Sequence, residues 1–211
     1  MDPDPIGGRG LTALASLRRF VRPRSEPETE RCALCGVDLA PEHAHLVEPA
    51  SRRLSCACDA CAFLLSGPAP ARYRRVPRRV ESLPGFRLSD ETWEALNLPI
   101  NLAFFKQSTP TGGVVALYPS PAGATESPVS ASAWEALAVE NPVLGGLEPV
   151  VEGLLVNRVG EARDYYRVGL DECYRLVGLI RVHWRGLSGG ATAWEEIGRF
   201  FADLKERCAH A

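Results

Sequence analysis

Three features are missing from this sequence of 211 residues: a long apolar run, an excess of charge of one sign, and an apolar leader. The net charge is −2, so no global positive field attracts nucleic acid or anionic lipid. No stretch approaches the ~18 uninterrupted apolar residues that a membrane span needs. The first residues, MDPDPIGG, are acids and turn formers where a secretion signal needs apolar residues. We therefore expect a cytoplasmic protein without a membrane span.

Cysteine is the residue type whose distribution is most informative. Seven cysteines are present, at positions 32, 35, 56, 58, 61, 173 and 208. An odd number without a signal peptide argues against a disulfide framework and for a reducing compartment. In such a compartment clustered cysteines bind metal more often than they form disulfides. The cluster within residues 32–61 therefore predicts a metal site.

The order of the clustered cysteines is that of a treble-clef zinc finger. Cys32-Ala-Leu-Cys35 followed by Gly36 is typical of a metal-binding knuckle, because glycine lets the backbone turn behind the ion. Residues 45–48 and 53–56 predict the arms of a hairpin that turns at 49–51. Cys58-Asp-Ala-Cys61 then opens an apolar helical segment, whose N-terminal dipole favours thiolate over thiol. We predict four metal ligands: Cys32, Cys35, Cys58 and Cys61.

Zinc is the ion that this ligand set favours, because four thiolates complete its tetrahedral shell and make a structural site. The same four sulfurs can also hold a rubredoxin-like iron or an iron–sulfur cluster, so iron stays open as the alternative. Cys56 stays open as well. On an extended strand it faces the same way as Cys58, so it could replace one ligand or lie beside the site.

The rest of the chain predicts an α+β fold. Trp-Glu-Ala-Leu occurs at 93–96 and again at 134–137, and each copy opens a predicted helix followed by two strand-like runs. The runs are 100–106 and 114–118, then 151–157 and 165–170. This pattern suggests a degenerate α-β-β repeat that forms an antiparallel four-stranded sheet packed with helices. Two further helices, 172–184 and 194–207, close the chain, and strands followed by helices favour α+β.

Several capping residues and region boundaries follow from the same pattern. Ser89 and Asp171 are predicted helix caps, and Ser132 with Glu135 and Thr192 with Glu195 match the capping box. We expect four regions: a flexible basic lead with a short helix (1–30), a four-cysteine metal module (31–65), a linker with an Arg-rich strand (66–88), and the α+β domain (89–211). Residues 119–127, a stretch of small residues, are interpreted as a structural loop.

Two histidines beside the cluster raise the question of nuclease activity. His43 and His45 stand where a treble-clef nuclease would place its general base. That catalytic plan also needs a metal-binding histidine in the following helix, and segment 59–65 (DACAFLL) has none. We interpret both as surface histidines, and a treble-clef nucleic-acid-binding protein is only a distant alternative.

Outside the metal module, an arginine cluster and the apolar pair Phe104-Phe105 are candidates for partner binding. The rest of the chain has a net negative charge, and no series of aromatic residues is present for base stacking. The arginines therefore favour a protein partner over nucleic acid. The predicted docking patch comprises Arg74, Arg75, Arg78 and Arg79.

These motifs together resemble a bacterial family of unknown function. The resemblance rests on CALCG, EHAHLV, RRLSCACDACAFL, ALYPSPAGATES, LLVNR and CYRLVGLIRVHWRGLSGG, and covers roughly residues 17–207. Members are encoded in the gene clusters of high-affinity uptake nickel–iron hydrogenases. The resemblance implies a role in hydrogenase assembly or operation and brings no catalytic residues. It carries over the cysteine pattern at five positions: Cys32, Cys35, Cys56, Cys58 and Cys61.

The sequence therefore favours a non-enzymatic accessory protein, a zinc-stabilised module joined to an α+β domain, that docks on a hydrogenase subunit or a maturation factor. The alternative is an iron-binding redox or metal-delivery protein that uses the same cysteines.

Overall fold

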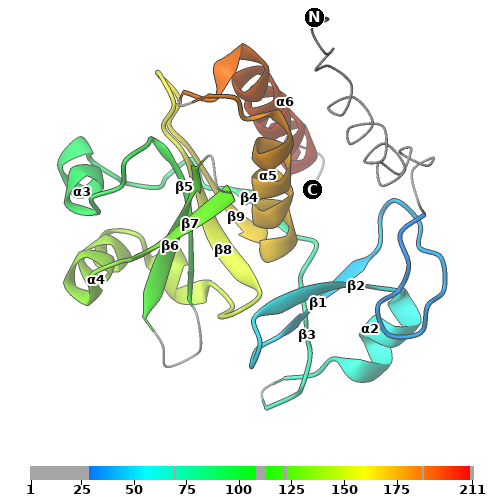
Figure 1. The fold of residues 1–211 in the computed structure, drawn as a ribbon. Helices are drawn as coiled ribbons and strands as arrows, with labels where there is room; N and C mark the ends of the chain where they lie inside the picture. Colours follow the sequence, from blue (N-terminus) through cyan, green and yellow to red (C-terminus); the bar gives the residue numbers. More distant parts are fainter. Residues whose placement is uncertain (1–28, 69, 108–112, 121–122, 187, 210–211) are drawn as a thin grey trace, which may run out of the picture.

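Two antiparallel sheets organise the chain in the computed structural model, which describes residues 29–68, 70–107, 113–120, 123–186 and 188–209 (Figure 1). The smaller sheet has three strands and the larger has six. The predicted short helix at 11–21, and all of the predicted lead except residues 29 and 30, lie outside the described residues. The fold is thus a mixture of helices and antiparallel strands with a cysteine cluster ahead of the larger sheet.

The smaller sheet contains the predicted hairpin. Strands β1 (Ala44–Glu48) and β2 (Arg53–Ala57) pair antiparallel, with Ala44 opposite Ala57, and helix α2 (Asp59–Leu65) follows directly. The short strand β3 (Arg74–Arg75) adds to the other edge of β1, giving the order β2-β1-β3. The hairpin prediction is confirmed, and the first part of the Arg-rich segment belongs to this sheet.

The larger sheet has the strand order β4-β9-β8-β5-β6-β7, so the expectation of four strands is wrong. The strands are β4 (Val80–Ser82), β5 (Leu102–Gln107), β6 (Val114–Ser120), β7 (Gly123–Pro128), β8 (Glu152–Asn157) and β9 (Asp164–Gly169). The four central strands are the predicted ones. The two additional strands are edge strands of sequence VES and GATESP, whose small and polar residues give no apolar alternation. The prediction that 119–127 form a structural loop is also wrong, because β6 extends to Ser120 and β7 begins at Gly123. The small and polar residues of this stretch hid its strands in the same way.

The four central strands also fit the predicted repeat. Helix α3 (Asp90–Ala95) precedes β5 and β6, and helix α4 (Ala131–Glu140) precedes β8 and β9. Strands β5 and β8 pair antiparallel in the middle of the sheet, flanked by β6 and β9, which is the arrangement of two units related by an approximate two-fold axis. The two tryptophans of the repeated motif have equivalent places. The rings of Trp93 and Trp134 both contact Phe105, with centroids 6.3 and 5.8 Å away.

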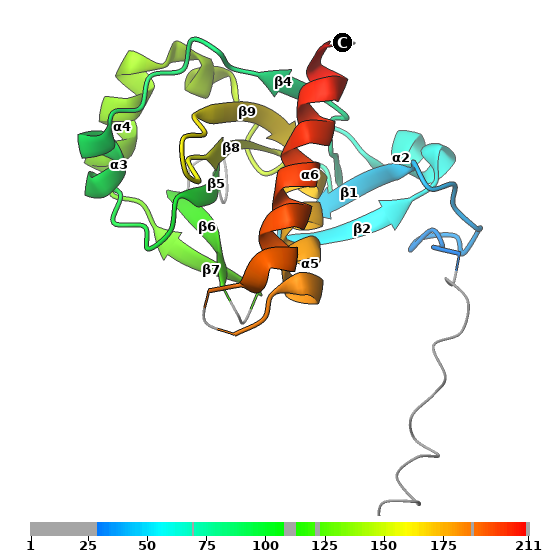
Figure 2. The same cartoon turned by 90° about the horizontal axis from the view of Figure 1, so that it is seen from above.

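Helices cover both faces of the larger sheet (Figure 2). Helices α3 and α4 and the 3-10 helix η2 (Pro142–Gly146) pack on the face that contains Phe105. Helices α5 (Leu170–His183) and α6 (Gly190–Ala209) pack on the opposite face, which contains Phe104. Because successive residues of a strand point to opposite faces, both phenylalanines are buried, with 2% exposure for Phe104 and 0% for Phe105. The interpretation of this pair as a partner-binding feature is therefore wrong.

Helix starts differ from the predicted caps at three positions. Ser89 caps α3 as expected, accepting a hydrogen bond from the Thr92 amide. Ser130, and not Ser132, caps α4, because its side chain reaches the Ala133 amide at 3.2 Å. Helix α5 starts after Gly169, so that Asp171 lies in its first turn. Helix α6 already begins at Gly190, ahead of the predicted Thr192 cap.

Phe105 is the position at which the larger core is best tested. Replacing Phe105 by Ala should lower the free energy of unfolding by about 3–5 kcal/mol, since it removes a fully buried ring between two tryptophans and leaves a cavity. Urea unfolding followed by tryptophan fluorescence measures the change. The matched control is Phe63→Ala, whose side chain is 79% exposed and whose loss should cost less than about 0.5 kcal/mol. Equal costs for the two variants would contradict this core assignment.

Candidate metal centre

The first two cysteines are held by a tight turn. The Cys32 amide donates to the Val37 carbonyl at 2.8 Å, and the Gly36 amide donates to the Cys32 carbonyl at 2.8 Å. Gly36 has a φ of 78°, a conformation that costs glycine little and most other residues more. The turn therefore depends on this glycine. In the turn Cys32 is buried and Cys35 is exposed.

The other two cysteines are held by the start of α2. Cys58 is the N-cap residue, and its Sγ accepts a hydrogen bond from the Cys61 amide at 3.4 Å. Cys61 itself lies in the first helical turn. Strand β2 ends one residue before Cys58, so the hairpin fixes where this helix begins.

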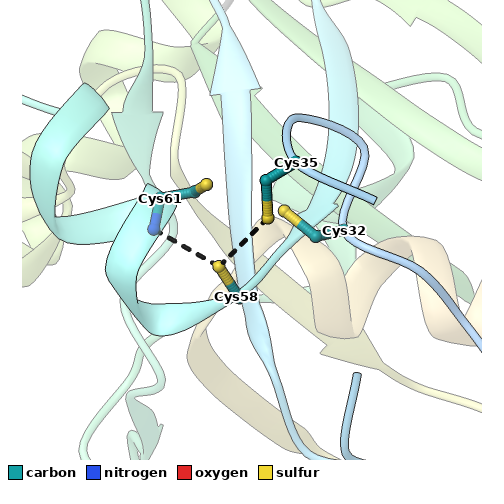
Figure 3. A group of neighbouring side chains, drawn as sticks. All are labelled: Cys32, Cys35, Cys58 and Cys61. Atoms are coloured by element: carbon teal, nitrogen blue, oxygen red, sulfur yellow. Dashed lines mark hydrogen bonds between the residues drawn. The ribbon is translucent and has the colours of Figure 1, made fainter. Parts of the chain in front are cut away.

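The turn and the helix bring four sulfurs together (Figure 3). All four Sγ atoms lie within 4.8 Å of one another, and those of Cys35 and Cys58 are 3.7 Å apart. A tetrahedral ion with metal–sulfur bonds of about 2.3 Å holds its sulfurs roughly 3.8 Å apart. The cluster of Cys32, Cys35, Cys58 and Cys61 can therefore bind one metal ion.

The pKa shifts of the clustered cysteines favour the binding of a cation. Hydrogen bonds with the sulfurs of Cys35 and Cys58 raise the pKa of Cys61 to about 12. Burial raises the pKa of Cys32, but hydrogen bonds from the amides of Cys58, Leu34 and Cys35 outweigh it and lower the pKa to about 6. Thus Cys32 forms a thiolate readily, whereas Cys61 resists ionisation. A bound cation removes that resistance, because it attracts every thiolate at once.

Cys56 lies outside this group of four. Its Sγ is grouped with His43 and His45, with the three ligand atoms within 4.8 Å of one another. Cys56 is directly opposite His45 in the hairpin register. Burial, followed by the charge of Glu30, raises the pKa of its thiol. Its carbonyl accepts a hydrogen bond from the Ala33 amide at 2.9 Å, so its backbone anchors the cysteine turn to the hairpin.

The two histidines are not the surface residues that the sequence suggested. The His43 side chain is only 6% exposed and that of His45 is 23% exposed. The reason is that the hairpin has two covered faces. Ala44 and Leu46 pack toward the cysteine cluster, while His45 on the other face reaches Asp171 of α5 at 3.0 Å. This second group, spread over residues 43–56, is a feature that the sequence analysis missed.

The four arginines of the predicted docking patch each have an acidic partner within the chain. Arg75 and Arg78 lie 3.2 and 3.8 Å from the Asp59 carboxylate at the start of α2. Arg79 lies 3.6 Å from Glu152, and Arg74, whose side chain is 13% exposed, pairs with Glu148. Two of the pairs are thus on the metal module, and two connect the Arg-rich segment to the larger sheet.

Replacing Cys58 by Ser should abolish metal binding and unfold residues 31–65, while 89–207 stay folded. The reason is that the module has a small core and depends on the ion for its folding free energy, which in finger peptides is on the order of 10–16 kcal/mol. Elemental analysis after a mild chelator wash and limited proteolysis provide the two readings. Cys208→Ser, at the far end of α6, is the matched control and should keep the ion. Cys56→Ser should also keep it, and loss of the chelator-resistant ion from that variant would contradict the four-cysteine assignment.

Comparison with known proteins identifies the family of this chain but not its function. Among the residues that the structure describes, none of the helices combines the length and apolar character needed to cross a bilayer. No curated protein and no solved structure matches the chain. The model of a family of unknown function, DUF5947, matches residues 31–208. That match spans both sheets and all five clustered cysteines, and this chain therefore belongs to the DUF5947 family.

Proposed function

We propose that this protein is a non-enzymatic, zinc-stabilised accessory protein that acts in the assembly or operation of a nickel–iron hydrogenase. The observation that carries the proposal is the closed set of four thiolates, which leaves a tetrahedral ion no position for a substrate. The order of cysteine turn, hairpin and helix is that of a treble-clef module, in which the ion supports the fold.

Zinc is the ion that this geometry supports best. The four sulfur atoms lie within 4.8 Å of one another, close enough to share one ion, whereas a cluster would put thiolates on separate iron atoms and hold them further apart. Zinc accepts four thiolates without a preference for another geometry.

The identity of the ion is tested by colour and elemental analysis of the purified full chain. We expect one tightly held zinc ion per chain and no visible absorption, because zinc has a filled d shell. A ferric thiolate site or an iron–sulfur cluster would absorb strongly in the visible region. Iron at one equivalent or more, with that absorption, would replace this proposal with an iron-binding redox or metal-delivery protein.

The surface of α2 fits a docking role. Phe63 and Leu64 are 79% and 75% exposed on this helix. Contiguous exposed apolar side chains of this kind mark protein interaction sites. Asp59 on the same helix pairs with Arg75 and Arg78, so the apolar surface lies next to two exposed cations. A partner with an apolar patch bordered by acidic groups would complement it.

The hydrogenase part of the proposal rests on the resemblance of the cysteine, ALYPSPAGATES and CYRLVGLIRVHW motifs to a family encoded beside uptake hydrogenase genes. A hydrogenase subunit or a maturation factor is accordingly the proposed partner. The proposed site of action is the cytoplasm.

Capture from hydrogen-oxidising cells tests the partner. A tagged chain should co-purify with a hydrogenase subunit or maturation factor, and the double variant Phe63→Ser, Arg75→Glu should reduce the captured amount at least about tenfold, the loss of ~1.4 kcal/mol or more. The metal content should stay normal. Val139→Ser, whose side chain is 81% exposed on α4, serves as the matched control. Capture of no hydrogenase-related protein, together with normal hydrogen uptake in a deletion strain, would refute the assignment.

A further inference from the structure

The second group of metal-ligating side chains lies at the junction between the two sheets. His43 precedes β1, His45 lies on β1, and Cys56 lies opposite it on β2. Their ligand atoms are within 4.8 Å of one another. The two imidazole rings are neighbours, with centroids 4.7 Å apart. Strand pairing fixes two of these residues on one face, so the grouping follows from the backbone and not from a chance side-chain orientation.

Each histidine has one ring nitrogen held by an acceptor. His45 Nδ1 lies 3.0 Å from a carboxylate oxygen of Asp171, and His43 Nδ1 lies 2.9 Å from the carbonyl oxygen of Ala40. Neither acceptor can donate, so both Nδ1 atoms carry the proton. In the neutral rings Nε2 then presents a lone pair. Metal-binding histidines are held in this way by a carboxylate or a backbone carbonyl.

One of these lone pairs has no hydrogen bond. His43 Nε2 is buried and forms none with any residue in the described part of the chain. Glu30 Oε2 lies 3.4 Å away, in a geometry that does not make a hydrogen bond. A lone pair that faces a carboxylate is unfavourable unless a positive charge lies between them. A buried polar atom without a partner calls for an explanation, and an ion is one.

We propose that His43, His45 and Cys56 form a second metal site, separate from the four cysteines, that takes a divalent transition metal ion of the zinc class. Imidazole and thiolate together suit zinc and exclude calcium and magnesium, which prefer oxygen ligands. Glu30, 65% exposed, lies where it can supply a fourth ligand or give way to water. Three protein ligands and one exchangeable position make this site more labile than the four-thiolate site.

The site connects the two halves of the molecule. The ligands belong to the hairpin of the smaller sheet, whereas Asp171, which orients His45, belongs to α5 on the larger one. Residues Val47, Val76, Val150 and Val151 form a small apolar cluster at the same junction. An ion bound here strengthens the attachment of the cysteine module to the α+β domain, and this inference does not depend on the hydrogenase assignment.

Cobalt is the probe that tests the site, because thiolate–cobalt bonds absorb in the near ultraviolet. The full chain, with zinc retained in the four-cysteine site, is titrated with Co²⁺ while the zinc content is monitored. We expect one equivalent of Co²⁺ to bind with a thiolate charge-transfer band and without release of zinc. Cys56→Ser should lose the band, and His43→Gln should weaken Co²⁺ binding at least about tenfold.

Asp171→Asn provides a test that keeps every ligand. Because Asp171 orients His45 and is not itself a ligand, the band should reach full amplitude at saturation, with an affinity lowered about 10–100-fold. His183→Gln and Cys208→Ser, which lie outside both clusters, are the controls and should bind as the wild type does. The site is refuted by the absence of a band in the wild type, or by a band that persists in Cys56→Ser. If Cys56→Ser fails to fold, unchanged binding in both His43→Gln and Asp171→Asn refutes it equally.

Discussion

The register of the hairpin between β1 and β2 is the constraint on which the other parts of the metal module depend. It pairs Ala44 with Ala57, so that both small residues lie against the cysteine turn, and it pairs His45 with Cys56 on the opposite face. The strand then ends one residue before Cys58, which starts α2 with its sulfur toward the turn. A slip of one residue would exchange the two faces and separate all of these groups. Two covered faces, one against the cysteines and one against α5, therefore specify this register.

Local chemistry explains which parts of the fold could be predicted. The cysteine turn, the hairpin and the helix start each depend on residues close in sequence, and the buried central strands contain short apolar runs such as LAFF in β5. The edge strands β4 and β7 have neither signal, because they are held by pairing with β9 and β6 and not by their own side chains. Helix caps are intermediate in how well they can be predicted from the sequence. Ser130 and Ser132 are equally good capping residues, and only the path of the chain decides which one reaches a free amide.

The His43, His45 and Cys56 group shows why only half of the candidate site could be predicted from the sequence. Part of the signal was present in the sequence: His45 begins one predicted hairpin arm, Cys56 ends the other, and His43 lies two residues ahead of the first arm. What the sequence could not supply was the contact of His45 with Asp171, which is 126 positions away. Without that contact, exposed histidines beside a metal site are the ordinary interpretation. With it, one imidazole has a fixed tautomer and a fixed direction, as a ligand needs.

The two sites share one strand, and this sharing has an energetic consequence. Cys56 of the proposed second site and Cys58 of the first are two residues apart, and the Cys56 carbonyl also holds the cysteine turn through Ala33. The hairpin can place His45 opposite Cys56 only when it is formed, and we propose that its formation depends on an ion among the four cysteines. On that proposal, an ion in the first site removes the ordering cost that the second would otherwise carry, which is positive coupling between the two sites. The expected order of loading therefore runs from the closed four-thiolate site to the labile one, and the second ion would act on a hairpin that is already in register against α5.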